Sequence, residues 1–251
     1  MMADLDNLSQ ETDRLVDTID TYGEGAAPFD AAMRTYMMRS FESYFQEGAC
    51  LQVGCAHGDQ TALLLERFTD LTVIEPTAEF LNHTRSRFAG RATFVEALIE
   101  DYETDKRFET IIFSHVLEHV IDPIEVISKL GDLLTPTGRL FVVVPNAEAP
   151  SRRIAVMMGI LSHLEALSAD DVAAGHRRVY WQDTLLRDVM GAQLALIDTG
   201  GILFKPLANF QFNGLMGGDL ITDAFMEGCY QLGREAPSAC ASIYVVASKK
   251  S

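Results

Sequence analysis

One stretch near the start of the chain constrains the fold most, because a short apolar strand, a turn with two glycines and a helical run follow one another there. Residues 51–61 read LQVGCAHGDQT. Glycine has no Cβ, so Gly54 and Gly58 would let a ligand approach the backbone, and the next helix offers free N–H groups at its first turn. This layout is typical of nucleotide-binding sites. The alternative is that the glycines serve only the geometry of the turn.

An acidic residue after the next apolar strand adds a second signal. The strand predicted over residues 71–74 ends in Glu75. In doubly wound sheets such an acid lies beside the first glycine turn, where its two oxygens can accept both hydroxyls of a ribose. A nicotinamide oxidoreductase would usually show GxGxxG at this turn, whereas residues 54–58 read GCAHG. The pair therefore favours a nucleoside site without an obvious place for a pyrophosphate.

Strands and helices alternate through the rest of the first half, with short joints between them. Strands are predicted over residues 50–53, 71–74, 91–96, 110–113 and 139–144, with helices over residues 59–68, 77–88 and 123–134. The last helix opens with Asp122 as N-cap, proline at the first helical position and Glu125 completing a capping pattern. This alternation predicts a doubly wound α/β sheet.

Composition limits the partners and the compartment. The 251 residues carry a formal net charge of −16, which repels phosphate backbones and anionic membranes, so we expect a small-molecule partner and neither nucleic acid nor membrane. The four cysteines form no CxxC pair, and no histidine lies at zinc-ligand spacing, so we expect free thiols and no metal. No leader pattern or membrane-length apolar run is visible, which predicts a soluble, cytoplasmic protein.

The order of these motifs resembles the class I S-adenosylmethionine-dependent methyltransferases, in the branch that acts on small molecules. The matching segments are LQVGCAHGD, VIEP, FVEALIEDY, FSHVLEHVIDP, LTPTGRLFVVVPN and the later GHRRVYWQDTLLRDV. The resemblance implies a Rossmann-like, mostly parallel seven-stranded sheet with a helical lid insertion. It also implies S-adenosylmethionine as cofactor and S-adenosylhomocysteine as product.

The same resemblance divides the chain into four segments. Residues 1–46 would be N-terminal helices that form a lid or cap, and residues 47–146 the cofactor-binding core. Residues 147–192 would be a helical insertion or lid. Residues 193–251 would supply the strands and helix that complete the sheet and the acceptor pocket. The apolar stripe over residues 29–45 is either core packing, a lid over the cofactor or the contact of a homodimer.

Two positions depart from the family pattern of the cofactor cradle. Gln52 stands where an acid is usual, although it can still accept a hydrogen bond, and Ala56 stands where glycine is frequent. The residues that the resemblance assigns to the cofactor are Gln52, Gly54, Ala56, Gly58, Glu75, Ala97, Leu98 and Ser114. Among them Glu75 would hold the ribose, whereas Ala97 and Leu98 would lie near the adenine.

Three histidines are candidates for chemistry. Methyl transfer from a sulfonium is an in-line displacement, so positioning dominates, and a base is needed only for an acceptor that carries a proton, such as a hydroxyl. His115 follows the fourth strand, where parallel sheets place their ligands. His119 and His176 are further catalytic candidates, with a local packing role as the alternative for His119.

Two segments are candidates for binding the acceptor. Arg177 and Arg178 could receive an anionic group, with ion pairs to nearby aspartates as the alternative. The segment over residues 200–213 combines amides with aromatic side chains, which suits a small polar acceptor, although a hairpin on the sheet edge would also explain it. The predicted acceptor residues are Arg177, Arg178, Tyr180, Lys205, Asn209 and Gln211.

The predicted function is transfer of a methyl group to an O or N atom of a small molecule of the saccharide or secondary-metabolite type. Three alternatives remain. A protein or peptide methyltransferase would have an open acidic groove. A catalytically inert, cofactor-binding regulatory module would bind the cofactor without turnover. A nicotinamide oxidoreductase is the third, and the turn sequence counts against it.

Overall fold

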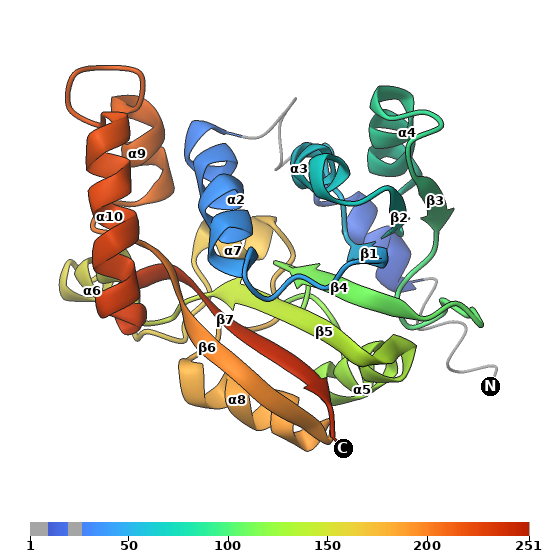
Figure 1. Ribbon diagram of the computed structural model, residues 1–251. Coiled ribbons are helices and arrows are strands. Elements are labelled where there is room, and N and C mark those ends of the chain that lie inside the picture. The colour runs from blue at the N-terminus through green and yellow to red at the C-terminus, as the bar shows by residue number, and fades with distance from the viewer. Residues whose placement is uncertain (1–9, 20–26, 251) are drawn as a thin grey trace.

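The computed structural model describes residues 10–19 and 27–250, and it contains one sheet of seven strands (Figure 1). The strand order is β3-β2-β1-β4-β5-β7-β6. The first five strands are mutually parallel, and β7 is antiparallel to both of its neighbours. Their bounds are β1 Ala49–Val53, β2 Asp70–Glu75, β3 Thr93–Glu96, β4 Phe108–Ser114, β5 Leu134–Pro145, β6 Leu194–Phe204 and β7 Cys240–Lys249. The predicted seven-stranded, mostly parallel α/β fold is confirmed.

Helices cover both faces of this sheet. In Figure 1, α2, α3 and α4 lie above it, and α5 and α8 lie below it. The long α10 packs beside α2 on the upper face. The bounds are α2 Pro28–Phe41, α3 Asp59–Arg67, α4 Ala78–Arg87, α5 Pro123–Leu133, α8 Gln182–Gly191 and α10 Asp223–Glu235.

The strand β5 shows why the sequence folds into three layers. Its apolar run is buried on both faces, because successive side chains point to opposite sides of a strand. Phe141 and Val143 join the core under α2 and α10, whereas Leu140 and Val142 join the core over α5 and α8. The apolar side chains of such a run are shielded from water on both faces only when helices cover both sides of the sheet.

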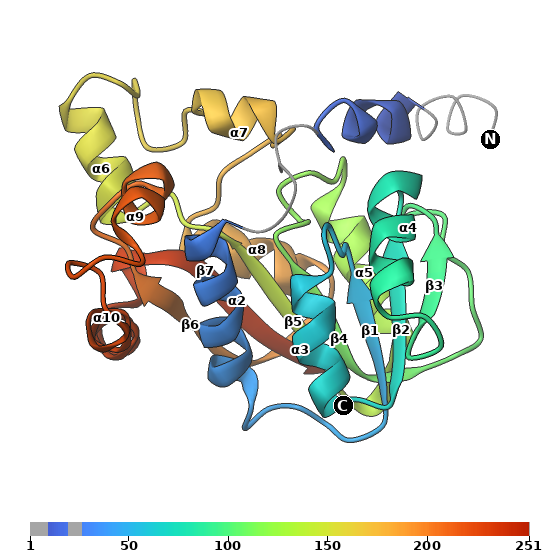
Figure 2. The ribbon, with the colours of Figure 1, turned by 90° about the horizontal axis from the view of Figure 1, so that it is seen from above.

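Three short α-helices, a 3-10 helix over Pro237–Ala239 and an N-terminal helix complete the described part of the chain. Between β5 and β6 lie α6 Pro150–Met157 and α7 Ala169–Ala173, and α9 Asn209–Leu215 follows β6. Figure 2 shows α6, α7 and the helix over residues 10–16 in a row along one side of the sheet. Arg14 of that helix donates to the Gly175 carbonyl at 2.6 Å, which fastens it to the segment after α7.

Several boundary predictions need correction. The segment over residues 200–213 is neither one loop nor a hairpin, because β6 continues through Phe204 and α9 begins at Asn209. The sequence Pro136-Thr137-Gly138 is typical of a turn, but it lies inside β5, where the register with β4 shifts. Within the described residues, the first of the N-terminal helices spans residues 10–16.

The apolar stripe over residues 29–45 belongs to the core. Phe29, Met33, Met37, Phe41 and Phe45 are all buried, and the Phe41 ring lies 4.8 Å from the Phe141 ring. Core packing therefore describes this stripe, since the chain's own sheet covers it. Separately, none of the helices in the described part of the chain is long and apolar enough to cross a membrane.

Candidate active site

The glycine turn after β1 needs its glycines for steric reasons within the chain. Gly54 has φ +78° and Gly58 has φ +85°, a region that favours glycine. A Cβ on Gly54 would lie 2.7 Å from Cγ2 of Val116, and one on Gly58 would lie 2.8 Å from Cγ2 of Thr84. The geometric explanation therefore holds for both positions, and it is compatible with a ligand above the turn.

Gln52 braces this turn from below. Its side chain is 0% exposed, its amide donates to the Gly54 carbonyl at 3.0 Å, and its carbonyl accepts from the Thr61 hydroxyl at 2.8 Å. A carboxylate could accept from Thr61 but could not donate to Gly54. The departure from the family pattern thus has a local reason, and both polar ends of Gln52 are used inside the chain.

This bonding predicts the effect of restoring an acid. Gln52→Glu should lower the free energy of unfolding by about 2–4 kcal/mol at neutral pH, because it buries a charge and removes the donor to Gly54. Chemical denaturation measures the change, with the isosteric Gln10→Glu at an exposed position of the N-terminal helix as control. Equal effects of the two substitutions would contradict the bracing role.

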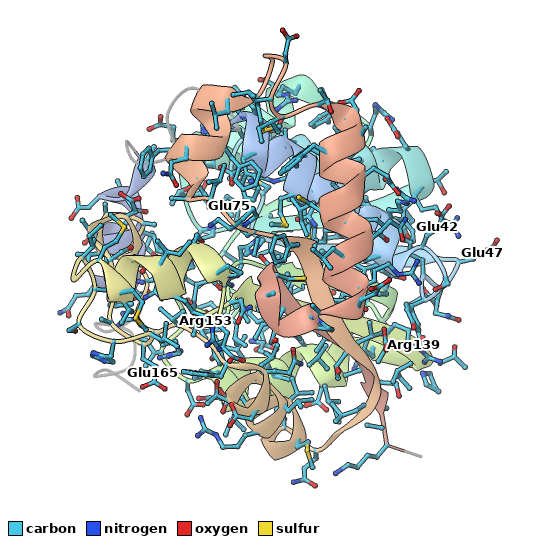
Figure 3. The ribbon with its side chains drawn as sticks, turned by 90° about the vertical axis from the view of Figure 1, so that its left-hand side faces the viewer. Glu42, Glu47, Glu75, Arg139, Arg153 and Glu165 are labelled. Carbon is cyan, nitrogen blue, oxygen red and sulfur yellow. The ribbon has the colours of Figure 1, made fainter. Side chains whose placement is uncertain are left out.

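Glu75 lies where the ribose hypothesis requires it, at the end of β2 and beside the glycine turn. One carboxylate oxygen accepts from the Cys55 N–H at 3.0 Å, and the other accepts from the Thr77 N–H at 3.1 Å and hydroxyl at 2.8 Å. The side chain is only 5% exposed, and Figure 3 shows it within the molecular outline, whereas Glu42 and Glu47 lie at the margin. Glu75 thereby links the turn that follows β1 to the residues that follow β2 through hydrogen bonds.

The adenine candidates lie on the next strand end. The Ala97 N–H donates to the Glu75 carbonyl at 3.3 Å, and the Leu98 side chain is buried. Because β3 pairs with β2 in parallel, the carboxyl ends of both strands meet at the same edge. The structure therefore places Ala97 and Leu98 at the strand end beside Glu75, and their contact with the adenine stays a prediction.

A glutamine that the sequence analysis missed completes the site. The Ser114 hydroxyl, at the end of β4, donates to the side-chain carbonyl of Gln60 at 2.7 Å. The amide nitrogen of Gln60 is buried and has no hydrogen-bond partner among the described residues. Buried amides are almost always paired, so this donor marks a place for an acceptor atom of a ligand. Nothing in the motif distinguishes Gln60 from an ordinary residue of α3.

His115 is held as a neutral ring. It has φ +54°, and its Nε2 lies 2.9 Å from the Ser242 hydroxyl. Burial lowers the pKa of His115 to about 3, and the positive charges of Arg34 and Lys205 act in the same direction. An imidazole with so low a pKa is a weak base at neutral pH but a good hydrogen-bonding group.

His119 and His176 lie together, next to the buried Glu118. Their rings meet edge to face with centroids 4.8 Å apart, and His176 Nε2 lies 3.9 Å from a Glu118 oxygen. Burial lowers the pKa of His119 to about 3, whereas burial raises the pKa of Glu118 to about 7. Burial alone would lower the pKa of His176, but the hydrogen bond to Asp171 and the charge of Glu118 raise it.

The two arginines predicted to bind the acceptor already make hydrogen bonds within the chain. Arg178 donates to the Val120 carbonyl at 2.7 Å, and Arg177 donates to the His119 carbonyl at 2.8 Å and pairs with Glu11. Neither the anion-binding role nor the expected pairing with nearby aspartates describes them, because they hold the loop after β4 in place.

The other predicted acceptor residues lie in three different settings. Tyr180 is buried and donates to Asp188 at 3.2 Å, so it belongs to the core. Gln211 accepts from the Ala208 N–H at 2.9 Å and caps α9, while Asn209 is exposed at the start of that helix. Lys205 alone presents a charge, with its Nζ 5.5 Å above the centre of the Phe29 ring.

Arg34, which the sequence analysis also missed, provides a second cation near Lys205. Its Nη1 is buried and without a hydrogen-bond partner among the described residues. Burial raises the pKa of the neighbouring Asp30 carboxyl, and the positive charges of Arg34 and Lys205 partly oppose that shift. Burial lowers the pKa of Lys205 itself to about 8.

Comparison with known proteins agrees with this geometry. A family model described as a methyltransferase domain matches residues 29–199, which is more than half of the chain. The chain belongs to the class I S-adenosylmethionine-dependent methyltransferases. Within this family, the matched region includes the glycine turn, Glu75 and the loop after β4.

Individual relatives of this methyltransferase are distant. An uncharacterized methyltransferase of Mycobacterium bovis is 33% identical over 95 residues, covering 37% of this chain and 48% of the relative. The trans-aconitate 2-methyltransferase of Methylobacterium radiotolerans is 26% identical over 151 residues, covering 59% of this chain and 58% of the relative. The chain thus spans about half the length of the curated relatives it matches.

Solved structures share the fold of this methyltransferase over nearly its whole length. A possible histamine N-methyltransferase of Thermotoga maritima is 15% identical with a TM-score of 0.64, covering 96% of this chain and 99% of that one. An N-methyltransferase of Bradyrhizobium japonicum in complex with S-adenosylhomocysteine is 15% identical with a TM-score of 0.55, covering 92% and 91%. At these identities the similarity establishes the fold.

Proposed function

We propose that this chain transfers a methyl group from S-adenosylmethionine to an O or N atom of a small molecule. The observation that carries the proposal is the buried, unpartnered amide of Gln60, which lies against Ser114 at the end of β4. The glycine turn and Glu75 stand on the neighbouring strand ends. A nucleoside with an amino-acid tail has acceptor atoms for the amide and hydroxyls for the carboxylate.

The residues present fit this cofactor. Gly54, Ala56 and Gly58 would lie along its methionine part, and the first-turn N–H groups of α3 favour a negative group there. Glu75 would accept a ribose hydroxyl, since a carboxylate has about four acceptor positions and the chain uses three. Ala97 and Leu98 would contact the adenine, with Ser114 and Gln60 closing the site.

When bound, the cofactor supplies a methyl group on a positively charged sulfur that leaves as a neutral thioether. The chain's own residues then need to hold the acceptor in line and exclude water. We assign the neutral His115 to hydrogen bonding of the acceptor, because its low pKa makes it a poor base. An acceptor with a free amine or a carboxylate would need no base.

The charges favour an acceptor with an anionic group. Arg34 and Lys205 are half-buried cations, and none of the ion pairs within 4 Å in the described ranges includes either of them. Cations in such a setting bind a carboxylate strongly, because solvent competes little. The name of the Methylobacterium radiotolerans relative specifies a carboxylic acid, which supports this class of acceptor.

The test is methyl transfer to a panel of small carboxylic acids and to their neutral amides, with labelled S-adenosylmethionine. We expect turnover of at least one acid and much weaker turnover of its amide. Arg34→Gln should raise KM for the acid roughly 10-fold to 100-fold, since a hydrogen bond to a charged group contributes about 1.5–3 kcal/mol. The exposed Arg153 in α6 provides the control, and Arg153→Gln should change nothing (Figure 3).

The pH dependence tests Lys205 separately. The pKa of Lys205 is lowered to about 8, so its charge is present below that pH and is lost as the pH rises through it. Affinity for an anionic acceptor should therefore fall above pH 8, and Lys205→Met should bind weakly without that fall. A pH profile of KM that is identical in the wild type and in Lys205→Met would argue against the assignment.

A further inference from the structure

Three potential metal ligands meet where the loop that follows β4 touches the segment between α7 and α8. Glu118 and His119 come from this loop, and His176 comes from the segment after α7. One ligand atom of each residue lies within 4.8 Å of those of the other two. This spacing is that of groups that can share a single ion after small side-chain adjustments.

Both imidazoles are already oriented for coordination through Nε2. His119 Nδ1 lies 3.3 Å from the Gly175 carbonyl, and His176 Nδ1 lies 3.1 Å from an Asp171 oxygen. A carbonyl and a carboxylate only accept, so Nδ1 carries the proton in each neutral ring, and Nε2 of that neutral form has the lone pair for an ion. Histidines that bind metals have this second hydrogen bond almost without exception.

The support behind His176 is itself well fixed. Asp171 accepts from Arg152 at 3.0 Å and from the Ser168 N–H at 2.8 Å. These bonds leave the carboxylate little freedom and so orient the His176 ring. A carboxylate that holds Nδ1 of an imidazole, with Nε2 of the same ring pointing away, is the arrangement usually found at a metal-binding histidine.

Glu118 provides an independent sign that a cation binds here. Its side chain is 0% exposed, and both of its oxygens lack a hydrogen-bond partner among the described residues. A carboxylate buried in this way costs free energy unless a charge or a donor compensates it. His176 Nε2 lies 3.9 Å from Oε1 of Glu118, which is within reach of an ion pair when the ring is protonated but too long for a hydrogen bond.

We propose that Glu118, His119 and His176 bind one divalent transition-metal ion. Two imidazoles and one carboxylate suit Zn²⁺, Co²⁺ or Mn²⁺ and leave coordination positions open, whereas Mg²⁺ and Ca²⁺ prefer oxygen ligands throughout. The sequence analysis expected no metal, because the third ligand comes from the segment after α7 and not from the same motif. The site is separate from the cofactor residues, so it does not depend on the proposed function.

The test uses the full chain after treatment with a chelator and dialysis. Calorimetric titration with Zn²⁺, Co²⁺ or Mn²⁺ should give one ion per chain for at least one of them, and Mg²⁺ should bind far more weakly. Glu118→Gln and His176→Gln should each weaken binding by about 100-fold or more, since even an outer-shell partner costs 10-fold to 100-fold. His83→Gln is the matched control, because the exposed His83 forms another histidine pair with His57, with ring centroids 5.6 Å apart.

Thermal denaturation separates a lost site from a lost fold. Without metal, Glu118→Gln should melt at or above the temperature of the wild type, because it removes an unpaired buried carboxylate. Addition of the bound metal should raise the melting temperature of the wild type and leave that of Glu118→Gln unchanged. Absence of stoichiometric binding, undiminished binding by Glu118→Gln and His176→Gln, or loss of binding only in His83→Gln would overturn the proposal.

Discussion

Glu75→Ala should weaken the binding of S-adenosylmethionine by about 10-fold to 100-fold, because a charge-assisted hydrogen bond to the ribose contributes about 1.5–3 kcal/mol. The same substitution leaves the buried N–H of Cys55 without its acceptor at 3.0 Å. The free energy of unfolding should therefore also fall, by about 1–3 kcal/mol. Calorimetry with the cofactor and chemical denaturation measure the two effects separately.

Glu96→Ala is the matched control for this substitution. Glu96 pairs with Glu75 across β2 and β3, but its side chain is exposed. The substitution Glu96→Ala removes the same charge from the same edge of the sheet. Because the Glu96 side chain is exposed, both cofactor affinity and stability should stay nearly unchanged. Equal losses of affinity in the two variants would mean that general electrostatics, and not contact with the ribose, explains the effect.

Gly54→Ala should lower the free energy of unfolding by about 2–4 kcal/mol, the sum of a left-handed alanine and an overpacked contact. The added Cβ would meet Val116 at 2.7 Å. We expect cofactor binding to be lost as well, since the turn must move to relieve the clash. Chemical denaturation and cofactor titration of the same preparation measure both.

Two further variants separate the causes of the Gly54 effect. Gly90 has φ +74°, and a Cβ added there would meet nothing within 4 Å, so Gly90→Ala isolates the backbone contribution at about 1–2 kcal/mol. The double variant Gly54→Ala, Val116→Ala removes the clash and keeps the positive φ. If Gly54→Ala proves no more destabilising than Gly90→Ala, the steric explanation of the turn is wrong.

The sheet and its strand-end residues could be predicted because local patterns determine them. The run Leu140 to Val143 is apolar at every position, which only a strand covered on both faces explains. Asp122 begins α5 as predicted, accepting from the N–H groups of Ile124 and Glu125 at 3.1 Å. Such signals lie within a few residues and need no knowledge of distant contacts.

The acceptor side was harder to predict, because its residues depend on which charges meet in space. The sequence suggested that Arg177 and Arg178 are available to bind an acceptor. In the structure, their guanidinium groups donate hydrogen bonds to backbone carbonyls of the loop after β4. Arg34 lies on an apolar helix and gives no sign in sequence that one nitrogen of its guanidinium is buried. Gln60 and Glu118 are likewise ordinary residues until their unpaired atoms are located.

Calorimetric titration of the purified chain with S-adenosylmethionine, S-adenosylhomocysteine and NAD decides whether the glycine turn and Glu75 hold a sulfur nucleoside. We predict binding of the two sulfur nucleosides in the micromolar range with one site per chain, no binding of NAD, and marked weakening by Glu75→Ala but not by Glu96→Ala. Binding of NAD in preference to either sulfur nucleoside, or binding that Glu75→Ala leaves unchanged, would contradict the assignment of this site.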